Sequence, residues 1–145
     1  MKTIVLYASK SGAAKECAQL LAEKIPEAEC HSVASRTPDL EGYDRIVLGS
    51  GVRIGKIYKA MKKYMEKNLD ALMAKEVVLY LCNGYPDTFE KAVKSIPFEL
   101  RQAALSIASF GGKPPFIKGK DGDDGWLNHE SIDRFVEQLS NYLQP

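Results

Sequence analysis

The sequence contains little of what marks disulfide-stabilised, membrane-spanning or nucleic-acid-binding proteins. It has three cysteines, Cys17, Cys30 and Cys82, an odd number without the spacing of a metal site. This usage is typical of a reducing cytoplasm rather than of a disulfide framework. The net charge of +1 creates no bulk field for a nucleic acid, and no apolar run approaches the ~20 residues of a membrane helix. We therefore expect a cytoplasmic protein that binds no nucleic acid and has no stable membrane insertion.

What the sequence does contain is a regular alternation of strand-like and helix-like segments. Its 145 residues, 45% hydrophobic and 27% charged, are typical of one globular domain over residues 1–145. The predicted strands cover residues 3–8, 29–33, 45–49, 76–82 and 106–110. The predicted helices cover residues 12–25, 56–72, 87–105 with a break at Pro97, and the segment after Asn128. This alternation predicts an α/β fold in which a five-stranded parallel sheet carries helices on both faces.

The first predicted strand runs directly into a small polar loop, Ser9-Lys10-Ser11-Gly12, and then into a helix. The first amides of a helix lack partners within it and carry the positive end of its dipole. Ser9 and Ser11 add hydroxyl donors, and Gly12 lets the backbone approach a ligand closely. This arrangement predicts a phosphate cradle, with Lys10 beside it.

Two more loops follow predicted strands and should lie at the same edge of the sheet. A glycine-rich segment, predicted as a turn over residues 50–55, follows the third strand, and Asn83-Gly84-Tyr85 follows the fourth. Ligands of parallel α/β sheets bind outside the carboxyl ends of the strands. The three loops therefore predict one shared binding site, in which no catalytic or metal-ligating residue is assigned.

The first loop and the alanines after it resemble the FMN phosphate loop of the flavodoxin family. Residues 49–56 are similar to the family's loop on one face of the isoalloxazine ring, and residues 82–85 stand where the family covers the other face. The resemblance implies a flavodoxin-like three-layer sandwich with strand order 2-1-3-4-5 and FMN as cofactor. Ala14 stands where the family often has threonine. The implied cofactor-binding residues are Ser9, Lys10, Ser11, Gly12, Ala13, Ala14, Ser50, Gly51, Val52, Arg53, Ile54, Gly55, Asn83, Gly84 and Tyr85.

Within the family, two motifs most resemble the branch that contains menaquinone-dependent protoporphyrinogen oxidases. One begins at Tyr43-Asp44 and ends at Gly55, and the other is residues 110–113, Phe-Gly-Gly-Lys. The resemblance implies a monomer or weak dimer that passes electrons through an exposed flavin edge to or from a partner protein or a flat aromatic or tetrapyrrole substrate. Two alternatives stay open, a protoporphyrinogen oxidase or dehydrogenase and a flavin-free binding module with the same fold.

One side of the second predicted helix is basic. The residues concerned are Lys56, Lys59, Lys62, Lys63 and Lys67. Such a face is either simply solvated or docks an acidic partner near the flavin edge.

Overall fold

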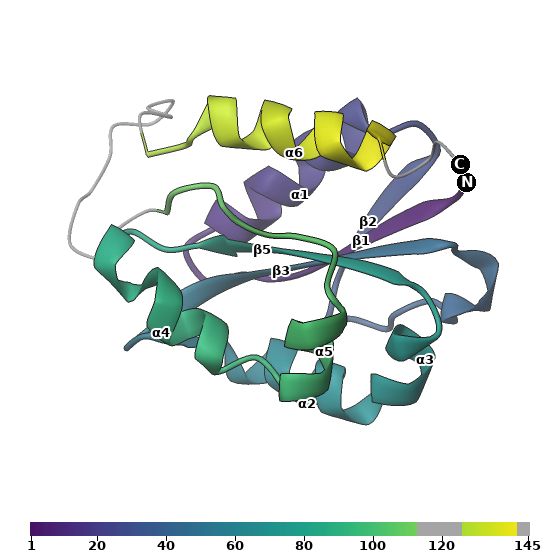
Figure 1. Cartoon of the computed structure of the whole chain (residues 1–145), viewed down its shortest axis with the longest axis horizontal. Helices are drawn as coiled ribbons and strands as arrows, with labels where there is room; N and C mark the ends of the chain where they lie inside the picture. The colour runs from purple at the N-terminus through teal and green to yellow at the C-terminus, as the bar shows by residue number, and fades with distance from the viewer. Residues whose placement is uncertain (113–125, 142–145) are drawn as a thin grey trace.

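The computed structural model describes residues 1–112 and 126–141, which form a sheet between two layers of helices (Figure 1). The parallel strands are β1 (Thr3–Ala8), β2 (Ala28–Ser32), β3 (Arg45–Arg53), β5 (Glu76–Cys82) and β6 (Ile107–Ser109). Their order is β2-β1-β3-β5-β6, which confirms the order expected for five strands. The short strand β4 (Lys56–Ile57) was not predicted and pairs antiparallel with the end of β3.

The helices divide between the two faces of the sheet. One face carries α1 (Ala13–Lys24) and α6 (His129–Asn141). The other carries α2 (Lys59–Lys67), α3 (Leu69–Met73), α4 (Phe89–Lys94) and α5 (Phe98–Ala103), and α4 and α5 are separated at Pro97 as predicted. Two single 3-10 turns, η1 (Leu40–Gly42) and η2 (Pro86–Thr88), complete the described elements. No helix among the described residues is both long enough and apolar enough to span a bilayer.

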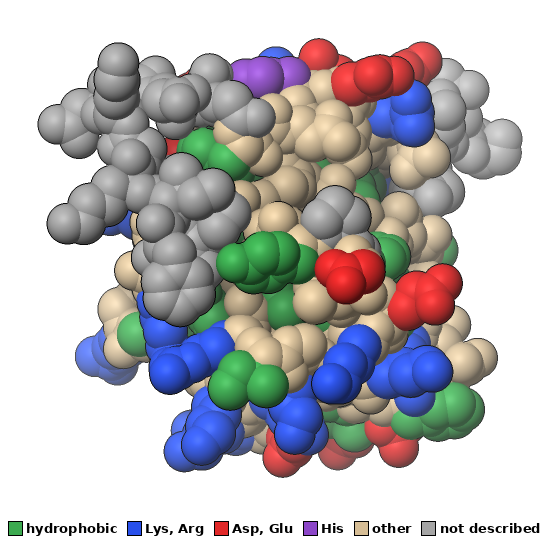
Figure 2. Space-filling model, turned by 90° about the vertical axis from the view of Figure 1, so that its left-hand side faces the viewer, with side chains coloured by type: hydrophobic (Ala, Val, Ile, Leu, Met, Phe, Trp, Pro, Cys, Tyr) green, Lys and Arg blue, Asp and Glu red, His purple; other side chains and the backbone are tan. Residues whose placement is uncertain are grey.

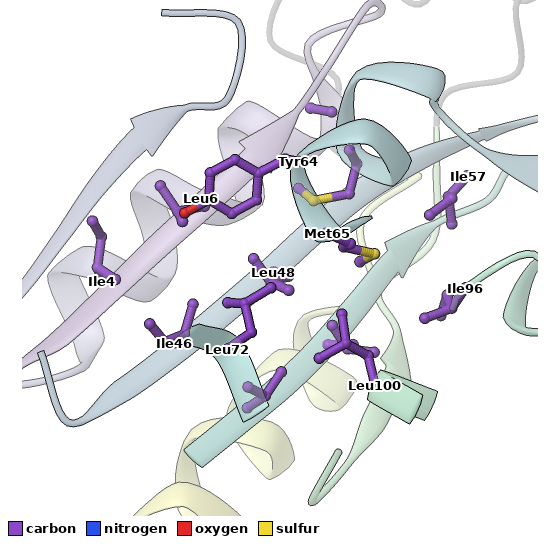
Figure 3. Packing of buried hydrophobic residues seen from close by; sticks show 14 of the residues in the cluster. Ile4, Leu6, Ile46, Leu48, Ile57, Tyr64, Met65, Leu72, Ile96 and Leu100 are labelled. Atoms are coloured by element: carbon purple, nitrogen blue, oxygen red, sulfur yellow. The ribbon is translucent and has the colours of Figure 1, made fainter. Parts of the chain in front are cut away.

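The alternation of side chains along each buried strand gives the protein two cores, one on each face. In β1, Ile4 and Leu6 point to the larger core, and Val5 points to the opposite core beneath α1 and α6. Figure 3 shows residues of the larger core, which come from strands, helices and the segment between α4 and α5: Ile4, Leu6, Ile46, Leu48, Ile57, Tyr64, Met65, Leu72, Ile96 and Leu100. Because full burial of one aliphatic side chain contributes about 1.5–3 kcal/mol, both faces of the sheet are firmly fixed.

The turn predicted over residues 50–55 is confirmed only at residues 54 and 55 and was wrong for residues 50–53, and the predicted start of the following helix at Lys56 was wrong. β3 continues to Arg53, and the chain then reverses through Ile54 and Gly55, both with positive φ, into β4. The antiparallel pairs Val52–Ile57 and Arg53–Lys56 form a short hairpin. Because these pairs hold residues 56 and 57 in a strand, α2 begins only at Lys59.

Candidate functional site

The three predicted loops meet at the carboxyl edge of the sheet, at the left in Figure 1. Ala8, the last residue of β1, is in register with Ser50 of β3. On the other side of β3, Gly51 is in register with Cys82, the last residue of β5. The segments that follow β1 and β5 therefore lie on either side of the outer end of β3, as the sequence predicted.

The first loop leads into α1 without a side-chain cap from the described residues. Gly12 is the residue before the helix, with a φ of 93°, and its amide donates to Ser9 Oγ at 3.1 Å. Within residues 1–112 and 126–141, no side chain caps the helix at this point. Lys10 and Ser11 are exposed, whereas Ala13 and Ala14 are buried. The loop thus combines uncapped backbone amides, the hydroxyls of Ser9 and Ser11 and the Lys10 ammonium group, which are groups that can bind an anion.

A buried tyrosine supports this loop from below. The Tyr80 hydroxyl donates to the carbonyl oxygen of Ala14 at 2.8 Å, and the ring stacks on Phe110 with centroids 4.9 Å apart. Gly49, its neighbour across the sheet, makes room for the ring, because a Cβ there would lie 1.9 Å from Tyr80 Cζ. Burial raises the pKa of Tyr80 well above its usual value, so the phenol stays a hydrogen-bond donor.

Sequence reasoning missed this role of Tyr80, although one signal for it exists. Tyr80 is the only residue with a hydrogen-bonding side-chain oxygen among the six that follow Glu76 in β5. Its partner Ala14 is brought near only by the packing of α1 on the sheet.

Two cysteines lie beside Tyr80 under the same loop. Cys17 of α1 and Cys82 of β5 are both buried, with sulfur atoms 3.6 Å apart, and the Cys82 thiol donates to Cys17. This hydrogen bond, together with burial, raises the pKa of Cys82 well above its usual value. Both thiols are thus buried beneath the first loop, and the raised pKa of Cys82 disfavours the thiolate that a nucleophile would need.

The hairpin formed by β3 and β4 places its polar groups differently from the sequence expectation. Ser50 is 1% exposed, and its hydroxyl donates to the carbonyl of Gly51 at 2.7 Å and accepts from the amide of Tyr58 at 3.0 Å. Its side chain thus holds the hairpin together. Val52 packs against the larger core, whereas Ile54 at the tip is 82% exposed.

Tyr58 lies across the hairpin and adjoins the first loop. A Cβ on Gly51 would lie 2.5 Å from the Tyr58 hydroxyl, and Lys10 Nζ lies 5.1 Å from the centre of the ring. Burial raises the pKa of Tyr58 above its usual value. A pocket of about 480 Å³ opens between loop and hairpin, lined by Lys10, Arg53, Ile54, Lys56, Ile57, Tyr58 and Lys59.

In the third loop, the Asn83 side chain makes hydrogen bonds within the protein instead of facing the solvent. Asn83 is 4% exposed; its amide donates to the carbonyl of Tyr85 at 2.9 Å, and its oxygen accepts from Ser109 Oγ at 2.7 Å. Tyr85 is half exposed. Gly112 packs against the loop so closely that a Cβ there would lie 2.8 Å from the carbonyl carbons of Cys82 and Asn83. Gly112 is a supporting residue absent from the predicted site, although the motif over residues 110–113 contains it; Lys113 lies outside the described residues.

The fold and the site define a three-layer α/β sandwich that can receive an anion at the carboxyl edge of its sheet. A family model described as a flavodoxin domain matches residues 4–114, and the chain belongs to this family. The resemblance stated from the sequence is thereby confirmed.

Individual relatives agree with this assignment. The chain is 29% identical over 90 residues to the protoporphyrinogen IX dehydrogenase (quinone) of Escherichia coli strain K12. The match covers 57% of this chain and 49% of the enzyme, so the chain spans about half the length of this relative. The flavodoxin of Fusobacterium nucleatum bound to flavin mononucleotide has a TM-score of 0.70 at 12% identity, covering 99% of this chain and 100% of that one. Oxidised flavodoxin 1 of Bacillus cereus has a TM-score of 0.66 at 20% identity, with the same coverage.

Proposed function

We propose that this chain binds FMN at the carboxyl edge of its sheet and serves as a redox protein. The observation that carries the proposal is the convergence of the uncapped start of α1 with the hairpin and the third loop. Family membership and the likeness to a flavodoxin bound to flavin mononucleotide support it. Bound FMN supplies one- and two-electron transfer, and the protein positions it and excludes water.

The first loop would hold the phosphate. Its donors are the amides of Ala13 and Ala14 and the hydroxyls of Ser9 and Ser11, with Lys10 as the nearby charge. The Ser9 oxygen already accepts from Gly12, which orients its hydroxyl hydrogen for donation to a further oxygen. Neutral donors on a fixed backbone can bind a phosphate without a buried countercharge.

The second and third loops would flank the ring. Ile54 and Tyr85 are exposed at this edge and offer apolar cover from the two sides, with Arg53, Gly51, Gly55 and Gly84 as backbone neighbours. Electrons would pass through the uncovered edge of the ring to or from a partner protein or a flat substrate. A cytoplasmic location belongs to the proposal and is supported by the free thiols of Cys17, Cys30 and Cys82.

The first test is titration of the purified protein with FMN, followed by flavin fluorescence and visible absorption. We expect quenching and a spectral shift in the unaltered protein. In Ser11→Asp, a carboxylate replaces a hydroxyl beside the phosphate, and we expect about 100-fold weaker binding from charge repulsion. Ser140→Asp is the matched control, because Ser140 is exposed near the amino ends of the strands.

The outcomes separate the proposal from its alternatives. Equal affinity in Ser11→Asp and the control would mean that the first loop does not hold the phosphate. No binding by the unaltered protein would overturn the redox proposal and favour a flavin-free binding module with the same fold.

A second candidate function is oxidation of protoporphyrinogen IX. The similarity to the Escherichia coli dehydrogenase favours it, and the exposed Ile54 and Tyr85 would suit a flat substrate. The test is anaerobic incubation of the FMN-loaded protein with protoporphyrinogen IX and a quinone, with porphyrin fluorescence as the readout. Porphyrin formation faster than with free FMN would establish this activity. An equal rate would exclude it and leave electron transfer to a partner protein as the proposed function.

A further inference from the structure

Positive charge is concentrated around the hairpin. Lys10, Arg53, Lys56 and Lys59 line one pocket, and the side chain of Lys91 packs against Gly55 at the hairpin tip. All five cations are exposed. None of them has an ion-pair partner within 4.0 Å among residues 1–112 and 126–141. We call these five residues the basic rim.

The basic rim is a local feature, since the whole chain has a net charge of only +1. Elsewhere, Lys24, Arg45 and Arg134 each lie within 4.0 Å of a carboxylate. Figure 2 looks onto the carboxyl edge of the sheet and shows Lys and Arg side chains gathered along its lower part. Unpaired like charges repel one another, so an anionic surface placed here gains Coulomb energy from several cations at once.

An apolar side chain stands within the basic rim. Ile54 is 82% exposed and has a φ of 52°, a conformation that a β-branched residue rarely adopts. The hairpin thus presents an aliphatic group beside a concave pocket of about 480 Å³. A protruding acidic segment of a protein can enter the pocket while an apolar group beside it contacts Ile54. A flat bilayer can contact only the tip of the hairpin.

We propose that the basic rim is the docking surface for an acidic protein that exchanges electrons with this chain. The inference rests on the proposed FMN site, because Lys10 belongs to the proposed phosphate loop and Arg53 and Ile54 to the proposed ring cover. A partner bound here would contact the edge of that site. The acidic character of the partner follows from the rim alone.

The test uses two forms of one electron acceptor with opposite charge. Native cytochrome c is basic, and its succinylated form is acidic but carries the same haem. Each reduced FMN gives up two electrons, which convert two ferric haems to ferrous haems, and the protons released go to water. Rates are measured by stopped flow at ionic strengths of about 0.01 M and 0.15 M, between which the Debye length falls from about 30 to 8 Å.

We expect the succinylated form to be reduced at least about tenfold faster at low ionic strength, with an advantage that shrinks as salt is added. The double variant Lys56→Glu, Lys59→Glu should lose this advantage. The matched control, Lys67→Glu with Lys75→Glu, makes the same change in net charge away from the pocket and should keep it. FMN affinity is measured for every variant, so that a lost cofactor is not mistaken for a lost docking surface.

A flavin-independent measurement separates the two proposals. Ferric succinylated cytochrome c is added to the ¹⁵N-labelled protein, and we expect amide shifts at residues 53–59 whether or not FMN is bound. Equal rates for the two cytochromes, equal effects of the two double variants, or no shifts at the rim would overturn the docking proposal. Binding to phosphatidylglycerol vesicles that only the rim variant loses, with no change in cytochrome rates, would also overturn it and would identify a membrane surface instead.

Discussion

The two ends of the sheet differ in the burial and pairing of their cationic side chains. At the amino end, Arg45 is 2% exposed; its Nη2 lies 3.1 Å from Glu76 Oε2 and donates to the carbonyl of Leu139. At the carboxyl end, the basic rim is exposed and unpaired within the described chain. A buried charge is tolerated only when partners replace its water. The amino-end cation therefore serves the fold, whereas the carboxyl-end cations remain available to a ligand.

The largest expected effect tests this contrast directly. Arg45→Ala removes a buried guanidinium that connects β3 to β5 and α6, and should lower the free energy of unfolding by about 3 kcal/mol. Lys59→Ala removes one cation of the rim and should change it by less than about 0.5 kcal/mol. Urea unfolding followed by circular dichroism measures both. Similar losses in the two variants would show that the rim also serves the fold.

The next effect compares two glycines at the carboxyl end of the sheet, one against a buried ring and one against a half-buried ring. Gly49→Ala forces a methyl group into the buried ring of Tyr80 and should cost about 2 kcal/mol of unfolding free energy. Gly51→Ala meets the half-buried ring of Tyr58, which can turn toward solvent, and should cost about half as much. Gly42→Ala is the control, because nothing lies within 4 Å of a Cβ there. If Gly51→Ala were the more harmful of the two, the hairpin would be the more rigid part.

The sequence predicts the elements that depend on local pattern. The apolar runs at residues 3–8 and 76–82 form strands with those bounds, and Asn128 caps the last helix by accepting from the amide of Ser131. The hairpin could not be foreseen from periodicity, because the glycines and polar residues among residues 50–55 are typical of a turn, and Val52 and Ile54 are too few to indicate a strand. Its strand pairing arises from contacts between Val52 and Ile57 across the reversal.

The candidate site shows the same division. The convergence of three loops follows from strand order alone, and the register confirms it. What each side chain does depends on contacts with residues outside its own loop or strand. Ser50 turns inward because the Tyr58 amide lies 3.0 Å away, and Asn83 does so because Ser109 approaches from β6. Such contacts appear only when the sheet is assembled.

A smaller effect concerns the hydrogen bond beneath the first loop. Tyr80→Phe keeps the ring but leaves the Ala14 carbonyl without its phenol donor, and should cost about 1 kcal/mol at neutral pH. Because burial raises the pKa of Tyr80, the folded protein holds this proton more tightly than the unfolded chain. The stabilisation that comes from this raised pKa is therefore present below the pKa of tyrosine in the unfolded chain, about 10, and is lost as the pH rises above it.

The alkaline limb of the stability curve checks that reasoning. Urea unfolding between about pH 8 and pH 11 should show a steeper fall for the unaltered protein than for Tyr80→Phe, because the variant lacks one group that titrates there. The pKa values of Tyr43, Tyr58 and Tyr64 are raised as well, so a shallower fall remains in the variant. Parallel curves would mean that Tyr80 ionises as easily in the folded protein as in the unfolded chain.

The smallest change in stability is expected for Cys30→Ser, and its effect is measured as the rate at which the remaining thiols react. The thiolate is the form that attacks a disulfide reagent, and it needs both access and a pKa near the working pH. Burial raises the pKa of Cys30 as well as that of Cys82, so access decides the order: Cys17 and Cys82 are buried, whereas Cys30 is half buried on β2. We expect an aromatic disulfide reagent at neutral pH to modify Cys30 first, and Cys30→Ser to react only at the rate of unfolding. Prompt reaction of that variant would show that the reagent reaches Cys17 or Cys82 in the folded protein. The core beneath the first loop would then open locally, and the rigid part of the molecule would not extend to the carboxyl edge of the sheet.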